Sequence, residues 1–436
     1  MRSGWLKIFA ALVFVLACSA AFLPSAAAAA PPWETGQSQP EDLKVKVVIF
    51  SPGEEIVAWF GHIAMVVEDT RLDVRRMYNY GMFSFDSKML VKFAMGRLWF
   101  WVGEAPVYRT YEFYKRQNRS VRIMELNLGP AERQEMAKAL AVNVHPENRD
   151  YLYHHYFDNC STRIRDLIDQ AIDGQLHGAT DEVTGQTLRD HTRRHAARNP
   201  GVEMLLMFLM NSDIDQPVTR WEEMFLPGEV EKVIRDLSYV NKAGETVALV
   251  ADEVVYFEPA GLAPIPEEPP TRVPGALAVG LLLGGLAVWL GRRYFLSAEA
   301  SSDASKPRRR WRVLFGLYHA AIGVMIGIPG LALAVMWIVT DHTVTYHGEN
   351  LFLGNPLTFL LIPLGIALAL GAASARRWLR PLWLVLAGLG ILLMPLSLLP
   401  FFDQNIWLPV AFILPILLGF GYVWWRYGAV VSVSAE

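Results

Sequence analysis

The sequence is organised around one stretch, Tyr153-His154-His155-Tyr156-Phe157-Asp158-Asn159-Cys160-Ser161-Thr162-Arg163-Ile164-Arg165-Asp166. This stretch holds one of the two cysteines of the chain, and the other, Cys18, lies in an apolar run near the N-terminus. A cysteine without a partner in its own domain is a buried core residue, a free thiol or a nucleophile. The residues around Cys160 therefore decide between a structural and a chemical role.

Those residues predict a helix that begins at Cys160. Asp158 and Asn159 are favoured N-cap residues, and Gly174 is a plausible stop. Apolar residues follow at helical spacing: Ile164, Leu167, Ile168, Ala171 and Ile172. The helix dipole and the open N–H groups of a first turn stabilise a thiolate and lower the pKa of the thiol. Arg163 and Arg165 would add positive charge, although a buried structural cysteine is an equal alternative at this point.

The N-terminus has the pattern of a signal peptide. Arg2 and Lys7 precede an apolar run, and small residues follow as far as Ala30. This order of a basic region, an apolar region and small residues is typical of an exported protein. We predict a signal peptide over residues 1–30 and export across the cytoplasmic membrane.

Residues 31–258 have the composition of a folded α+β domain. Strands are expected over 44–50, 62–67, 75–83 and 121–128, and a helix over 130–142. The aromatic run 98–101 is either a core element or a segment that enters a membrane interface. Residues 259–272 are rich in proline and predict a linker.

The last part of the chain predicts an all-α membrane domain of five helices over residues 273–427. Five apolar segments have about the length needed to span a bilayer: 273–290, 313–339, 357–373, 382–400 and 406–425. Arginine and lysine gather in the first and third connections, which the positive-inside rule places in the cytoplasm. The large domain then lies on the opposite, periplasmic side.

Several function classes are disfavoured. The net charge of −3 argues against a nucleic-acid partner. No phosphate-binding or dinucleotide-binding glycine motif occurs, so no nucleotide cofactor is expected. His191 and His195 have the spacing of metal ligands on a helix, but arginines beside them oppose a cation, so no metal is expected either.

A cysteine nucleophile needs a base, which is most often histidine. His62 follows Gly61 and opens an alternating apolar strand, where its side chain would project from a rigid edge. A strand-end histidine with an ordinary hydrogen bond is the alternative. His154 and His155 are nearer in sequence to Cys160 but flank aromatic residues, which favours packing.

These residues together resemble the periplasmic domain of the Lnb-type lipoprotein N-acyltransferases. The resemblance rests on Gly61-His62, on Tyr78-Asn79-Tyr80-Gly81-Met82-Phe83 and above all on Asp158-Asn159-Cys160-Ser161-Thr162-Arg163-Ile164-Arg165-Asp166. It continues through 146–149, 188–190 and 225–227. The segments Asp341-His342-Thr343-Val344-Thr345, Asn350-Leu351 and Asn355-Pro356-Leu357 resemble an exposed loop of the family's membrane half.

The order of these residues is also similar to permuted papain-like folds of the NlpC kind. That resemblance implies Cys160 as nucleophile, His62 as base and Asn79 as the residue that orients the imidazole, with Tyr78 or Tyr80 as alternatives to Asn79. Supporting or substrate-binding roles are expected for a further set: Asn159, Tyr78, Tyr80, Arg163, His342 and Asn350.

The implied activity is transfer of an acyl chain from a membrane phospholipid, through a thioester on Cys160, to the α-amine of a diacylglyceryl-cysteine on a lipoprotein. The expected location is the bacterial inner membrane, as a multi-pass protein with the thiol domain in the periplasm. Two alternatives stay open. One is a membrane-anchored cysteine hydrolase, either a phospholipase or a cell-wall amidase or peptidase. The other is a sensor or scaffold with a buried cysteine.

Overall fold

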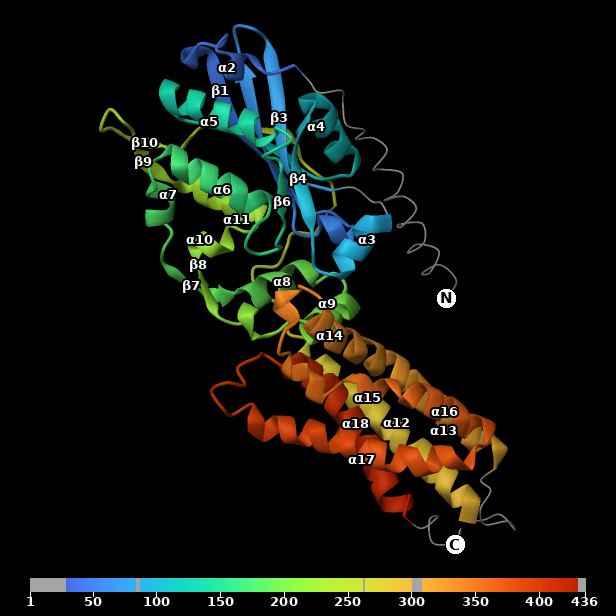
Figure 1. The fold of residues 1–436 in the computed structure, drawn as a ribbon. Coiled ribbons are helices and arrows are strands. Elements are labelled where there is room, and N and C mark those ends of the chain that lie inside the picture. The colour runs from blue at the N-terminus through green and yellow to red at the C-terminus, as the bar shows by residue number, and fades with distance from the viewer. Residues whose placement is uncertain (1–28, 84–86, 262, 300–307, 430–436) are drawn as a thin grey trace. The chain divides into compact units, whose positions relative to one another are not determined.

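A computed structural model of the chain describes residues 29–83, 87–261, 263–299 and 308–429 (Figure 1). The chain forms two compact units, the first up to residue 186 with 217–264 and the second from 187–216 with 265 onward. The segment 187–216, which the sequence analysis placed in the first domain, thus lies with the C-terminal helices. The predicted signal peptide falls almost wholly outside the described residues.

The first unit is built on an antiparallel seven-stranded sheet with strand order β11-β5-β1-β2-β3-β4-β6. The strands are β1 (Leu43–Phe50), β2 (His62–Asp69), β3 (Val74–Met82), β4 (Trp99–Ala105), β5 (Val121–Leu126), β6 (Asp150–Leu152) and β11 (Val250–Phe257). Strands β1, β2 and β3 are neighbours in sequence and in the sheet. The site residues of β2 and β3 therefore lie near its middle.

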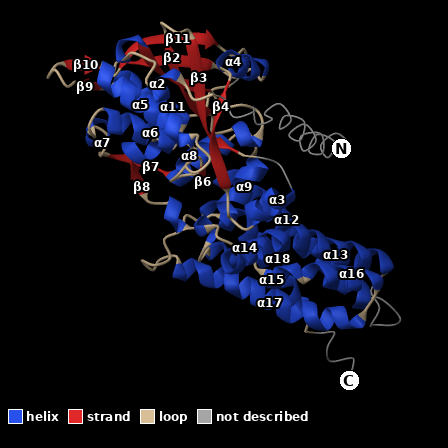
Figure 2. Cartoon of the chain, turned by 45° about the horizontal axis from the view of Figure 1, so that its top comes forward, coloured by secondary structure: helices blue, strands red, loops and turns tan. Residues whose placement is uncertain are grey.

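Helices cover both faces of this sheet, as the two views of the ribbon show (Figures 1 and 2). One face packs against α5 (Pro130–Asn143), α6 (Cys160–Ala171) and α11 (Pro227–Asp236), and the other against α4 (Val107–Arg116). Because side chains alternate along a strand, Val47 and Ile49 enter the first layer and Val48 and Phe50 the second. A segment buried on both faces has to be continuously apolar, as β1 is from Val47 to Phe50, whereas Lys44 and Lys46 alternate with buried residues earlier in the strand.

Shorter elements complete the first unit: α2 (Pro32–Thr35), α3 (Ser87–Ala94), α7 (Gln175–Gly178), α10 (Arg220–Glu223), β7 (Val183–Thr187) with β8 (Pro217–Thr219), and β9 (Ser238–Val240) with β10 (Thr246–Ala248). The aromatic run forms β4, where Trp99 is 53% exposed and Phe100 is buried. Successive side chains of β4 thus alternate between the surface and the core. The α+β prediction is confirmed.

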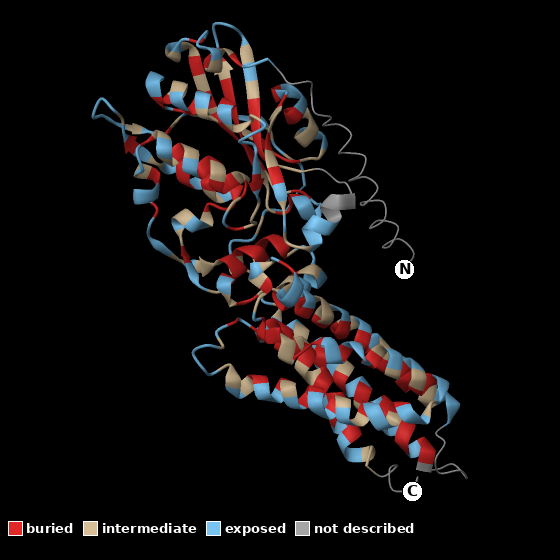
Figure 3. Ribbon diagram, in the orientation of Figure 1, coloured by how far each residue is buried: buried red, intermediate tan, exposed pale blue. Residues whose placement is uncertain are grey.

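The second unit is helical. Its elements are α8 (Leu188–Ala196), α9 (Pro200–Leu209), α12 (Val273–Glu299), α13 (Arg309–Ile322), a π-helical turn η5 (Gly323–Gly327), α14 (Ile328–Val339), η6 (Thr343–Thr345), η7 (Glu349–Phe352), α15 (Pro356–Phe359), α16 (Leu361–Leu370), α17 (Ala373–Leu396) and α18 (Trp407–Tyr427). Large apolar side chains remain exposed on the outer faces of the long helices (Figure 3), for example Leu282 and Ile338. Such surfaces suit a lipid environment.

Four helices of the described residues are long and apolar enough to cross a membrane, at 273–298, 309–339, 373–396 and 407–427. The count reaches five if 343–352 and 356–370, which are bent by 66°, form one broken span. The predicted span 357–373 is thus a shorter helix pair, and α16 ends at Gly371 in a left-handed conformation. The prediction of an all-α domain with several membrane-type helices is confirmed, and its count of five spans is reached only if this bent pair is one span.

Close helix packing in the second unit depends on glycine. A Cβ atom built at Gly316 of α13 would lie 2.5 Å from the Ala369 nitrogen and 2.6 Å from the Gly365 oxygen of α16. One at Gly280 of α12 would lie 2.5 Å from the Phe412 oxygen of α18. Small residues let helix backbones approach in this way when apolar side chains alone give no preference for helices over lipid.

The Gly316→Ala substitution is expected to destabilise the second unit by about 1–3 kcal/mol, because the new methyl group meets rigid backbone. A lower melting temperature of the purified full-length protein would report this loss. Gly285→Ala is the matched control, because a Cβ there meets no atom within 4 Å. Equal melting temperatures for the two variants would contradict the packing described.

Candidate functional site

Helix α6 begins with a capping box that fixes the backbone of Cys160. The Asn159 Oδ1 atom accepts hydrogen bonds from the N–H groups of Ser161 at 2.8 Å and Thr162 at 3.0 Å, and Thr162 Oγ1 accepts one from the Asn159 N–H at 2.8 Å. The amide of Asn159 also donates to the carbonyl oxygens of His155, at 2.6 Å, and Phe225, at 3.0 Å. Cys160 is therefore the first residue of α6, as the sequence predicts.

The thiol of Cys160 lies against the first residues of β2. The Ile63 backbone forms a hydrogen bond with the Cys160 sulfur, and Ile63 directly follows His62. A Cβ built at Gly81 of β3 would lie 3.9 Å from the Cys160 Cβ. The side chain of Cys160, the first residue of α6, thus lies at the end of the sheet where β2 begins.

His62 is held at the start of β2 by stacking and by a turn that requires glycine. Its ring stacks with Phe50, at 5.9 Å between centroids, and with Tyr114 of α4, at 6.1 Å. Gly61 has φ of 80°, and a Cβ there would lie 3.1 Å from the Phe50 oxygen. A larger residue before His62 would be strained.

Asn79 lies beside His62, with its Oδ1 atom 3.2 Å from His62 Nε2. The register pairs Asn79 with Ala64, two residues after His62, so the two side chains are diagonal neighbours on one face. A carboxamide oxygen only accepts hydrogen bonds, so Nε2 carries the proton in this arrangement. The other ring nitrogen, Nδ1, then keeps its lone pair.

Tyr78 and Tyr80 lie on the opposite face of β3. The Tyr78 hydroxyl accepts a hydrogen bond from the indole N–H of Trp33 at 3.1 Å, and the Tyr80 hydroxyl accepts one from the Asn143 amide at 2.8 Å. Both tyrosines are buried in the layer covered by α5 and α6. The structure thus brings Asn79, rather than either tyrosine, to His62.

Burial keeps the thiol and the imidazole of this site neutral at neutral pH. It raises the pKa of Cys160 against the opposing effect of hydrogen bonds from Ile63 and Ser161. It also lowers the pKa of His62 to about 4, with the charge of Arg119 as the second cause. The thiolate expected from the helix N-terminus is therefore outweighed by desolvation.

Arg119 is a cation whose charge acts on both His62 and Cys160, and the sequence carried no signal for it. It is buried, its Nε donates to the Ser51 oxygen at 2.6 Å, and its guanidinium lies 4.6 Å from the centre of the Tyr114 ring. Its charge interacts with Cys160. The buried Nη2 atom has no hydrogen-bond partner among the described residues, and a buried guanidinium with an open donor suits an anion.

The arginines that follow Cys160 are paired elsewhere. Arg163 forms two hydrogen bonds with Asp158, at 2.5 and 2.7 Å, and lies over the Tyr151 ring. Arg165 pairs with Asp166 and lies over Trp221. Their charges are therefore compensated by neighbouring carboxylates.

His154 and His155 belong to the loop before α6. His154 Nδ1 accepts hydrogen bonds from the N–H groups of Tyr156, at 3.3 Å, and Phe157, at 3.2 Å. The His155 ring packs against Phe60 and Phe225. Both rings shape the loop that presents Asn159.

His342 and Asn350 lie in the second unit. The Asn350 amide is buried and donates to the carbonyl oxygens of Met207 at 3.1 Å and Phe208 at 3.0 Å, at the end of α9. His342 precedes η6, where its carbonyl oxygen accepts a hydrogen bond from Thr345 at 2.8 Å. Asn350 thus holds α9 onto the loop that contains η7.

A cysteine at a capped helix start, against the strand that carries the histidine of a His–Asn pair, defines a thiol-bearing α+β domain. Apolar helices of membrane-spanning length follow it in the chain. Residues 29–194 match the family model of the Lnb N-terminal periplasmic domain. The chain therefore contains a domain similar to the Lnb N-terminal periplasmic domain, and the resemblance is confirmed over those residues. A search of curated proteins found no match, and a search of solved structures found none. The domain and the apolar helices together suggest a multi-pass membrane protein.

The ionisation of the site predicts how fast Cys160 is alkylated at different pH values. Because the pKa of the thiol is raised, the rate with iodoacetamide should be low at pH 6 to 7 and rise continuously toward alkaline pH. Mass spectrometry of the Cys160 peptide measures that rate, with free cysteine as the reference thiol. A rate that is high and constant from pH 5 to 8 would indicate a thiolate–imidazolium pair and contradict this account.

Proposed function

We propose that the protein is a lipoprotein N-acyltransferase that uses Cys160 as nucleophile and His62 as base. The observation that carries the proposal is the His62–Asn79 hydrogen bond, at 3.2 Å, next to the strand residue whose backbone contacts the thiol. It leaves Nδ1 of His62 available to take a proton. The Lnb-type domain supports the class of reaction.

In the first half-reaction the Cys160 sulfur attacks the carbonyl carbon of an acyl ester in a membrane phospholipid. The thiol proton passes to His62 Nδ1, because both groups are neutral at rest, and a C–S bond forms. The ester C–O bond breaks, and His62 returns the proton to the leaving oxygen. The products are a thioester on Cys160 and a lysophospholipid.

In the second half-reaction the α-amine of a diacylglyceryl-cysteine attacks the thioester. A C–N bond forms, the C–S bond breaks, and the proton lost by the amine passes through His62 to the sulfur. The enzyme returns to its neutral state, and the lipoprotein carries a third acyl chain. Both substrates are anchored in a bilayer, which suits a thiol domain attached to apolar helices.

Arg119 stabilises the negative oxygen that forms in each half-reaction. Its Nη2 is a buried donor without a partner among the described residues, and its charge interacts with Cys160. The N–H groups of Ser161 and Thr162 are occupied by the cap, which leaves the Cys160 N–H as the other donor at this helix start. Charged donors in a desolvated site act strongly on a developing charge. Asn159 supports the site by positioning the start of the helix.

The proposal is tested in bacteria that lack their own N-acyltransferase, by mass spectrometry of a lipoprotein N-terminal peptide. Cells with the wild-type protein should add one acyl mass, and Cys160→Ala should add none. His62→Ala should slow transfer by about 10²–10⁴-fold, as for loss of a general base, and Asn79→Ala should cause a smaller loss.

His177→Ala is the matched control, because His177 is an exposed histidine of the same unit, and its ring packs at a tilt against Trp221. It should transfer like the wild type. An expressed protein that adds no acyl mass would overturn the proposal. Release of free fatty acid by that protein would assign a hydrolase instead.

Arg119→Met should lower the transfer rate by about 10²–10³-fold, as for loss of one oxyanion donor. It should also move the acidic limb of the pH–rate profile to higher pH, because the Arg119 charge helps to lower the pKa of His62. Arg122→Met is the control, since Arg122 pairs with Glu231 outside the site. A profile that keeps its shape after Arg119→Met would exclude this electrostatic role.

A further inference from the structure

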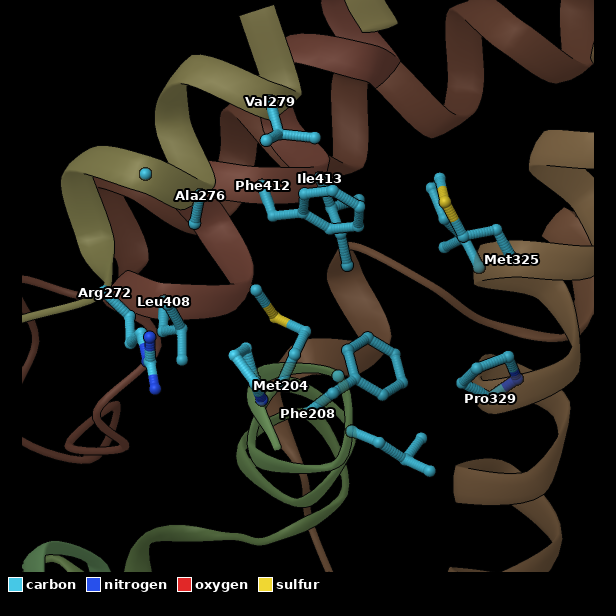
Figure 4. A pocket seen from close by; sticks show the side chains of 15 residues that line it. Met204, Phe208, Arg272, Ala276, Val279, Met325, Pro329, Leu408, Phe412 and Ile413 are labelled. Carbon is cyan, nitrogen blue, oxygen red and sulfur yellow. The ribbon is translucent and has the colours of Figure 1, made fainter. Parts of the chain in front are cut away.

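The second unit contains an apolar cavity of about 640 Å³ at one end of its helices (Figure 4). Its lining comes from α9, the start of α12, the turn η5 with α14, and the start of α18. Figure 4 shows Met204 and Phe208 of α9 between Arg272 at one end and Met325 with Pro329 at the other. A volume of this size is within the range of small-molecule sites, about 300–1,000 Å³.

The ends of the helices that form the cavity lie at one side of the unit. Close contacts run from Gly280 with Phe412 to Gly284 with Pro415, so α12 and α18 are parallel and begin at the same end. Helix α9 is fixed at that end by Asn350, and the Gln404 amide donates to the Met210 oxygen at 2.9 Å. Under the predicted topology this is the periplasmic end.

The cavity has one charged group, Arg272. Arg272 Nε lies 3.2 Å from Glu203 Oε2, and Nη2 donates to the Ala197 oxygen at 2.6 Å. Arg193 Nε binds the other oxygen of the buried Glu203 at 3.0 Å. Two guanidinium groups thus share one carboxylate, so these three side chains together carry a net positive charge.

An apolar cavity with a positive end matches an amphiphile that has an apolar chain and an anionic head. Between membrane helices the surrounding medium is acyl chain, so water does not compete for this space. The methionines Met204 and Met325 adapt to a chain of irregular conformation. A guanidinium suits a phosphate, because it offers several donors in one plane.

We infer that this cavity binds one acyl chain of an outer-leaflet phospholipid, with the lipid phosphate at Arg272. Binding of the lipid in the cavity does not depend on the proposed function. Only the role of this lipid as the acyl donor rests on that function. A chain held there is withdrawn from the bulk bilayer, and its head group stays at the membrane surface. The second unit would then bind a substrate as well as anchor the chain.

The test uses the full-length protein with Cys160→Ala in nanodiscs, so that binding is read without chemistry. The probe is phosphatidylglycerol with a photoreactive diazirine in one acyl chain, and cross-linked peptides are mapped by mass spectrometry. Labelling should concentrate on peptides that contain Met204, Met325 and Phe412. A second protein carries Ala276→Phe in addition to Cys160→Ala. The phenyl ring would fill the cavity and should lower that labelling at least about fivefold.

The matched control is Leu282→Phe, on the same helix α12, where the side chain is 71% exposed and outside the cavity. It should leave labelling of the cavity unchanged. Arg272→Gln should lower labelling by the phospholipid probe several-fold and leave labelling by a matching diacylglycerol probe unchanged.

Labelling spread evenly over the lipid-facing surface, or insensitive to Ala276→Phe, would show an adventitious bilayer contact only and overturn the inference. Equal labelling by the diacylglycerol probe, or stronger labelling by a diazirine fatty acid, would overturn recognition of a phospholipid. Cavity labelling with no acyl transfer by the wild-type protein would keep the inference and reject the proposed function.

Discussion

The site depends on the cap that Asn159 forms at the start of α6. One carboxamide satisfies two N–H groups of the helix and two carbonyl oxygens of neighbouring segments, so it fixes both the helix start and the loop before it. With the helix start fixed, the Cys160 side chain lies at the beginning of β2, where the Ile63 backbone contacts its sulfur. The same burial that holds the residue in place makes its thiolate costly.

The two units differ in what they bring together. The first unit places His62 beside Asn79 and within reach of the charge of the buried Arg119. The second unit closes its helices through glycine contacts and leaves an apolar cavity where α9 enters the bundle. Segment 187–216 belongs to that bundle, although it is encoded between elements of the first unit.

The sequence predicted much of this, because the decisive signals were local. Asp158 and Asn159 predicted the start of α6, and the apolar runs predicted the long helices. The partner of His62 could not be fixed, since the register of β2 with β3 depends on a turn at 70–73 that includes the left-handed Asp73. Arg119 was missed because its burial arises from contacts with distant segments. The placement of 187–216 was missed because its polar residues are satisfied by loops some 130 positions away.

The most direct measurement of the central claim is intact-mass spectrometry of the purified protein after incubation with phospholipid in the absence of a lipoprotein acceptor. The account predicts an added acyl mass on Cys160 that neutral hydroxylamine removes, together with one equivalent of lysophospholipid. The Cys160→Ala variant should show neither. Steady release of lysophospholipid and fatty acid without a trapped thioester would contradict transfer through Cys160.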